Sequence, residues 1–231
     1  MKKRLKIAIL ALAFVLVLAS GTFLIYASDY YRADPVAQAI GQSSVVTQLQ
    51  DGLIVLEGDS SDKTALIFYP GAKVEYIAYL PILEKIRQTN GITCILVKMP
   101  FNMAIFDADA AAGVIKQFPE MENWYVGGHS MGGAMASDFA SKNPDKVEGL
   151  ILLGAYLYGD YPAEKALTVY GSFNTSVAEK VDYSENVVVL EGGNHAQFGN
   201  YGKQKGDVDA TITGEEQQDM AAGAIARFLA R

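Results

Sequence analysis

The segment that decides the fold reads WYVGGHSMGGA and covers residues 124–134. Its first five residues are apolar or glycine, as expected of a buried strand, and a helical pattern over residues 131–142 follows. Gly128, Ser130 and Gly132 stand between the two, in the pattern Gly-x-Ser-x-Gly. On a tight strand-to-helix turn a side chain at either glycine would strike the strand or the helix. The sequence therefore predicts a strained turn that presents Ser130 at the end of a strand.

Strands and helices alternate on both sides of this turn. We predict further buried strands over residues 65–69, 93–97, 147–153, 166–170 and 186–190. We predict further helices over residues 74–88, 104–117 and 215–229, and expect Pro81 to kink or divide the first of them. This alternation predicts an α/β fold with a mostly parallel sheet and helices on both faces. Before it we expect a short helix over residues 35–40 and a hairpin of residues 45–49 and 53–57.

The amino terminus combines a basic flank with a long apolar run. The flank contains Lys2, Lys3, Arg4 and Lys6, and residues 7–28 carry no charge. The 20 residues from 7 to 26 span roughly 30 Å as a helix, the thickness of a bilayer core. A cleaved signal peptide is the alternative, with small residues near 19–21 and at Ala27. The length favours an uncleaved single-pass transmembrane helix, and the basic flank places the remaining chain outside the cytoplasmic membrane. A secreted protein is the alternative localisation.

Composition narrows the class of protein further. The chain has 231 residues, half of them hydrophobic, and a net charge of −7. Without the four basic charges of residues 1–28, residues 29–231 carry −11, which excludes a basic nucleic-acid-binding domain. One cysteine, Cys94, and two histidines exclude a disulfide framework and disfavour a metal site, so we expect no metal and no cofactor. We expect a single domain over residues 29–231; the oligomeric state is not indicated.

The histidine count selects a partner for Ser130. His129 occupies the variable position of the turn, where its side chain is not expected to reach Ser130 as a base. His195 is the other histidine, and it follows the strand predicted over residues 186–190. Loops at the carboxyl ends of parallel strands carry the functional groups of such sheets. We therefore expect His195 to act as general base for a nucleophilic Ser130.

The negative charge that forms when a serine attacks a carbonyl needs two N–H donors. The residue after the nucleophile, Met131, is expected to supply one. The loop after the strand of residues 65–69 is expected to supply the other, from Ala72 or alternatively Gly71.

These motifs together resemble the α/β-hydrolase superfamily, and in particular its small, lidless, dienelactone-hydrolase-like branch in a bacterial, membrane-anchored form. The resemblance covers about residues 29–231. It rests on residues 69–74, 98–102, 128–133, 192–199 and 201–207. It implies an α/β-hydrolase fold and a serine hydrolase that cleaves carboxylic esters of small molecules.

One position departs from the resemblance. Where the family places the acid that supports the histidine, this chain has Asn174. An amide can hold the imidazole ring but cannot stabilise the imidazolium by charge. Asp160, after the strand of residues 147–153, is the first substitute carboxylate, and Asp182 is a less favoured one. The alternatives are a slow site that uses Asn174, or a degenerate site with a binding role.

The remaining expectations concern the substrate. Only 12 residues, 154–165, separate two of the predicted strands, which leaves no room for a cap domain. An open site favours small or exposed esters over long buried lipids. Tyr156 and Tyr158 are candidates for lining it. An acyltransferase would use the same acyl-enzyme, and the sequence does not separate it from a hydrolase.

Overall fold

The computed structural model describes residues 2–49 and 51–231. The chain divides into two compact units, Met1–Tyr30 and Tyr31–Arg231. The turn residue Gln50 of the predicted hairpin lies outside the described residues.

The first unit consists mainly of helix α1 (Lys2–Ser28). Its segment Arg4–Ser28 has a mean hydropathy of 2.6, and large apolar side chains along it, such as Leu10, Val17 and Ile25, are exposed. By length and composition this helix could cross a membrane, and a signal sequence near an amino terminus has the same properties.

The second unit is built on an eight-stranded sheet within the described residues. Its strands are β1 (Thr47–Gln48), β2 (Leu53–Leu56), β3 (Thr64–Tyr69), β4 (Thr93–Val97), β5 (Asn123–His129), β6 (Gly149–Leu153), β7 (Ala166–Gly171) and β8 (Val187–Leu190). They lie in the order β1-β2-β4-β3-β5-β6-β7-β8. The β1–β2 and β2–β4 pairs are antiparallel, and all others are parallel. The predicted α/β fold with a mostly parallel sheet is confirmed.

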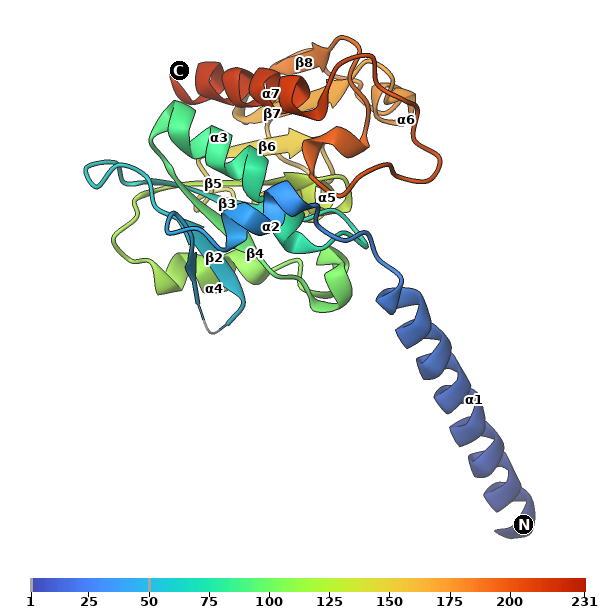
Figure 1. Ribbon diagram of the computed structural model, residues 1–231. Helices are drawn as coiled ribbons and strands as arrows, with labels where there is room; N and C mark the ends of the chain where they lie inside the picture. Colours follow the sequence, from blue (N-terminus) through green and yellow to red (C-terminus); the bar gives the residue numbers. More distant parts are fainter. Residues whose placement is uncertain (1, 50) are drawn as a thin grey trace. The chain divides into compact units, whose positions relative to one another are not determined.

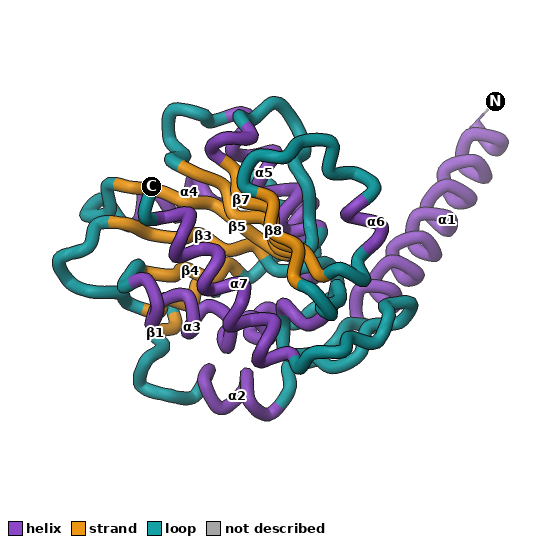
Figure 2. The backbone as a smooth tube through the Cα atoms, turned by 90° about the horizontal axis from the view of Figure 1, so that it is seen from above, coloured by secondary structure: helices purple, strands orange, loops and turns teal. Residues whose placement is uncertain are grey.

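Helices cover both faces of this sheet (Figures 1 and 2). One face packs against α2 (Pro35–Gly41), α3 (Leu80–Asn90) and α7 (Gly214–Leu229), and the other against α4 (Ala110–Gln117) and α5 (Met131–Lys142). Strand β3 shows the alternation: Leu66 and Phe68 belong to the first core, and Ile67 and Tyr69 to the second. Successive side chains of a strand point to opposite faces, so both must be apolar here.

Two predicted helices are divided. The segment predicted over residues 74–88 forms a 3₁₀ turn, Tyr76–Tyr79, and then α3, with Pro81 in the first turn of α3. Proline is tolerated there because the first helical N–H groups lack an intrahelical acceptor. The segment predicted over residues 104–117 likewise starts with a 3₁₀ turn, because Asp107 leaves the helical region at φ −154° and ψ 61°.

The carboxyl ends of β3, β5, β6, β7 and β8 lie at one edge of the sheet. The loops that follow these ends contain Ala72, Ser130, Asn174 and His195. A further short helix, α6 (Thr175–Ala178), begins directly after Asn174.

The close packing of α5 against β3 gives a stability prediction. A Cβ at Gly132 would collide with the carbonyl oxygens of Tyr69 and Pro70. We expect Gly132→Ala to lower the free energy of unfolding by about 1–3 kcal/mol through overpacking. Gly113→Ala is the matched control, because Gly113 lies in α4 and a Cβ there would have no described atom within 4 Å.

We expect Gly113→Ala to raise the free energy of unfolding by about 0.5–1 kcal/mol, since alanine restricts the unfolded chain. Urea denaturation of both variants gives the comparison. Equal effects of the two substitutions would contradict the steric explanation.

Candidate active site

Ser130 stands in a strained backbone conformation between β5 and α5. Its φ of 54° and ψ of −122° lie outside the regions that side chains allow. The Ser130 N–H donates to the carbonyl oxygen of Leu153 at 3.0 Å, which binds the turn to the end of β6. A Cβ on Gly128 would lie 2.6 Å from the carbonyl oxygen of Tyr69, so glycine is required for the close approach. The turn thus has the geometry that the sequence predicts.

His195 lies beside this serine. Its Nε2 is 3.1 Å from the Ser130 Oγ. The Asp207 carboxylate accepts the backbone N–H groups of His195 and Ala196, at 3.3 and 2.7 Å. The structure therefore brings Ser130 and His195 together, and Asp207 holds the loop that carries the histidine.

The buried Gln217 of α7 binds the same loop from the other side. Its Oε1 accepts the N–H of Asn194, and its Nε2 donates to the carbonyl oxygen of Asn194, both at 2.9 Å. Sequence reasoning missed Asp207 and Gln217 as supports of this loop. Asp207 lies in the tract 201–207 that contributes to the resemblance, but the sequence does not reveal the contacts of either residue, because each acts on backbone groups more than ten residues away.

Burial controls the protonation of His195. Desolvation lowers the pKa of its imidazole, and the negative charge of Asp207 opposes this effect. The neutral ring, which can accept a proton, is therefore favoured.

Asn174 is the side chain that faces the other ring nitrogen of His195. It is 4% exposed, and its Nδ2 lies 2.7 Å from His195 Nδ1. Ser176 Oγ donates to Asn174 Oδ1 at 3.0 Å. In contrast, Asp160 and Asp182 are exposed, and within the described residues neither forms a hydrogen bond or ion pair with His195. The position at which the resemblance implies an acid is thus filled by a buried amide.

The orientation of this amide sets the tautomer of His195. An amide nitrogen only donates, so Nδ2 facing Nδ1 requires the imidazole proton to be on Nε2. In that tautomer Nε2 donates toward Ser130 Oγ and cannot take its proton. A half turn of the amide would present Oδ1 to an Nδ1 proton, and Ser176 could then accept from Nδ2 because a hydroxyl both donates and accepts. The same residues can hold the ring in either tautomer.

The residues predicted to supply N–H donors to an oxyanion lie at the start of α5 and in the loop after β3. Met131 is the first residue of α5, where backbone N–H groups have no intrahelical acceptor and the helix dipole favours negative charge. In the loop, the Gly71 N–H donates to Tyr79 Oη at 3.0 Å. Because that donor is occupied, Ala72 is the better candidate of the two for the second oxyanion N–H.

A cavity of about 420 Å³ lies against Ser130, His195 and Asn174, and neither Met131 nor Ala72 is among its lining residues. Its lining residues are Ser130, Phe173, Asn174, Thr175, Ser176, His195, Gln204, Lys205, Gly206, Asp207 and Val208. Tyr156 and Tyr158 are not among them, and Tyr158 is 51% exposed. The wall formed by residues 204–208 was not predicted as part of the site.

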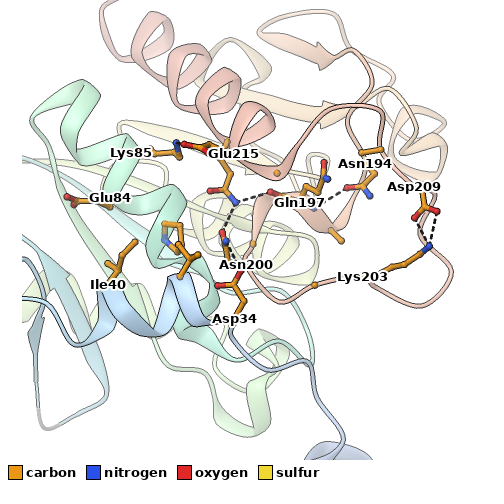
Figure 3. A pocket seen from close by; sticks show the side chains of 18 residues that line it. Asp34, Ile40, Glu84, Lys85, Asn194, Gln197, Asn200, Lys203, Asp209 and Glu215 are labelled. Carbon is orange, nitrogen blue, oxygen red and sulfur yellow. Dashed lines mark hydrogen bonds and ion pairs between the residues drawn. The ribbon is translucent and has the colours of Figure 1, made fainter.

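A larger cavity, of about 750 Å³, lies elsewhere in the domain (Figure 3). It is lined by α2, α3 and α7 and by the loop of Asn194, Gln197 and Asn200, and it contains neither Ser130 nor His195. The smaller cavity is the candidate active site because the predicted nucleophile, Ser130, and the predicted base, His195, meet there. Among residues 2–49 and 51–231, no group of three or more His, Cys, Asp or Glu side chains is arranged to hold a metal ion.

Three solved structures share this fold. A membrane phospholipase A, described as a novel bacterial virulence factor, is 14% identical with a TM-score of 0.55 and covers 100% of this chain and 98% of its own. A thermophilic esterase from Thermogutta terrifontis is 15% identical with a TM-score of 0.52, and covers 80% of this chain and 96% of its own. A putative lipase from Acinetobacter baumannii AYE is 12% identical with a TM-score of 0.55, over 84% and 94% of the two chains. Identities this low show a common fold.

No curated protein sequence matches the chain. The alpha/beta hydrolase family matches residues 65–219, which is more than half of the chain and includes the turn at Ser130, Asn174 and His195. With its parallel sheet, its strained strand-to-helix turn and this match, the protein belongs to the alpha/beta hydrolase family.

Proposed function

We propose that this protein is a serine hydrolase that cleaves carboxylic esters through Ser130 and His195. The observation that carries the proposal is the 3.1 Å separation of Ser130 Oγ and His195 Nε2 at a strained turn. The esterase and the putative lipase that share the fold support ester cleavage as the class of reaction.

The proposed reaction has two halves. Ser130 attacks the ester carbonyl while His195 takes its proton, and the N–H groups of Met131 and Ala72 stabilise the oxyanion. His195 then protonates the leaving alcohol, and an acyl-enzyme remains. Water, deprotonated by His195, releases the acid and restores Ser130. The first half requires the tautomer of His195 with its proton on Nδ1.

The cavity and the amino terminus support the choice of substrate and place. A site of about 420 Å³, with only residues 154–165 between β6 and β7, suits a small or exposed ester. The apolar helix α1, with its basic flank, supports a protein anchored in the cytoplasmic membrane with its catalytic unit outside. A lipid-derived ester fits this location, and a phospholipase A shares the fold.

The amide at the position of the acid favours a second candidate function, that of a weak or inactive hydrolase that binds its ligand. With Nδ2 toward His195, the base holds its proton on the wrong nitrogen for attack by Ser130. A binding protein needs no such proton transfer. The two functions are separated by covalent reaction at Ser130.

A fluorophosphonate probe tests the nucleophile. We expect the purified full chain to be labelled, and we expect Ser130→Ala to abolish labelling, because the probe reacts only with an activated serine. Mass spectrometry locates the adduct. If the folded protein shows no labelling that depends on Ser130, the enzyme proposal fails and the binding function stands.

Asn174→Asp tests the position of the acid. A carboxylate would accept the Nδ1 proton of His195 with one oxygen and the Ser176 hydroxyl with the other. We expect kcat/KM for a short acyl ester to rise by about 10²- to 10⁴-fold, since the productive tautomer becomes the stable one. The variant Asp160→Asn tests the alternative that Asp160 is the substitute carboxylate. Loss of ester hydrolysis in that variant would make Asp160 the functional acid.

The pH dependence of kcat/KM tests the base. Because burial lowers the pKa of His195, we expect the acid limb of the profile to lie below pH 6.5. Asp207 raises this pKa, so Asp207→Asn should move the acid limb to lower pH. An acid limb that stays in place, or moves upward, would exclude His195 as the group that titrates.

A further inference from the structure

The buried histidine of the turn has a role that the proposed reaction does not use. His129 precedes Ser130 and is 1% exposed. Its Nδ1 lies 2.8 Å from Tyr79 Oη, and its Nε2 lies 2.9 Å from the backbone carbonyl oxygen of His195. A buried imidazole with partners on both nitrogens is held in one orientation.

The chemistry of the partners determines where each proton lies. A carbonyl oxygen only accepts, so His129 Nε2 carries the proton and donates to His195. In the neutral ring Nδ1 then accepts, and Tyr79 Oη is its donor. Tyr79 Oη itself accepts the N–H of Gly71 at 3.0 Å. The hydrogen bonds therefore run from Gly71 to Tyr79, from Tyr79 to His129, and from His129 to His195.

The surrounding backbone makes room for this chain of hydrogen bonds. A Cβ on Gly71 would lie 2.6 Å from Tyr79 Oη and 2.8 Å from His129 Nδ1. A Cβ on Gly154, whose φ is +53°, would lie 3.2 Å from His129 Nε2 and 3.1 Å from His195 Nδ1. Only glycine at position 71 permits the contact between the turn, Tyr79 and His129.

The series of hydrogen bonds from Gly71 to His195 connects the two loops that must be aligned for acyl transfer. Gly71 precedes Ala72 in the oxyanion loop, and His195 is the base. We propose that His129 is a positioning residue: with Tyr79 it joins the oxyanion loop to the backbone of His195 and so sets the geometry of Ser130, its base and its oxyanion donors. The kinetic consequences of this proposal rest on the proposed function. The hydrogen bonds are present whether or not the protein is an esterase.

A neutral ring is needed at this position. The rings of His129 and His195 have centroids 4.6 Å apart, so a second positive charge would oppose the imidazolium that forms on His195. Complete burial and the neighbouring His195 hold the pKa of His129 well below its ordinary value. The titratable groups that face the ring are Tyr79 and His195.

The chain contains two histidines, which makes a direct test simple. In the full-length protein labelled with ¹⁵N-histidine, one set of ring resonances belongs to His129 and one to His195. The variants Ser130→Ala and Asn174→Asp identify the His195 set, because they change the groups that contact that ring. We expect His129 to remain neutral, with its proton on Nε2, throughout the pH range in which an ordinary histidine titrates. In Tyr79→Phe its Nδ1 resonance should move to the position of a nitrogen without a hydrogen bond. A proton on Nδ1, or titration within this range, overturns the proposal.

Steady-state kinetics test the positioning role. We expect His129→Phe and Tyr79→Phe to lower kcat by roughly 10- to 100-fold with KM little changed, because a misplaced base affects the transition state more than ground-state binding. His129→Gln retains a donor near the position of Nε2 and should recover most of the kcat lost in His129→Phe.

Tyr161→Phe is the matched control for loss of a buried tyrosine hydroxyl. Tyr161 is 5% exposed and donates to the carbonyl oxygen of Val147 at 3.0 Å, and Val147 precedes the amino-terminal end of β6, whereas the site loops follow the carboxyl ends of the strands. We expect it to lower the melting temperature about as much as Tyr79→Phe while kcat is retained. Equal kcat in Tyr79→Phe and Tyr161→Phe, at equal folded fraction, contradicts the positioning role.

The two proposals fail in different ways. If wild-type protein hydrolyses no ester and Ser130 is not labelled, the proposed function fails, and the ¹⁵N spectra still report whether His129 joins the two loops. If esters are hydrolysed but His129→Phe and Tyr79→Phe keep wild-type kcat, the positioning role fails and the proposed function stands.

Discussion

The site depends on the close approach of two backbone segments. One is the end of β3, and the other is the turn between β5 and α5. Gly128 and Gly132 allow the carbonyl oxygens of Tyr69 and Pro70 to touch the turn, and no side chain fits there. This packing forces Ser130 to the positive φ that presents its hydroxyl beyond the sheet. The strain is stored locally and is offset by the two apolar cores on either side of the sheet. A helix placed any farther from β3 would move both the serine and the first oxyanion donor.

Side chains far from the reacting atoms then align the loops. Asp207 and Gln217 hold the backbone around His195, while Tyr79 and His129 link it to the loop after β3. Each of these side chains satisfies a backbone N–H or carbonyl group that would otherwise lose its hydrogen bond on burial. The supports are therefore required by folding as well as by the geometry of the site, which explains why a slow or inactive hydrolase could keep them.

Asn174 has the position of a supporting acid but lacks its negative charge. It is buried, bonded to Ser176 and placed against His195, as a supporting acid would be. Without a negative charge it orders the ring but does not select the tautomer that accepts a proton. The candidate site thus has its serine and histidine in contact, with an amide at the position of the acid.

The periodic pattern of apolar residues predicted the strands, the parallel sheet and the helix after Ser130, because burial on both faces demands continuous apolar runs. The Gly-x-Ser-x-Gly spacing and the scarcity of histidine led to Ser130 and His195, since those depend on local sterics and on counting. Pro81 led to the division of the helix predicted over residues 74–88. The break at Asp107, the exclusion of Tyr156 and Tyr158 from the cavity, and the wall at residues 204–208 did not follow from such patterns. Only the tertiary structure decided that Asn174 rather than Asp160 faces His195, and that His129 reaches Tyr79 and the backbone of His195. The physical reason is that local periodicity reports burial, whereas hydrogen bonds between residues 50 or more positions apart depend on how the whole sheet brings its loops together.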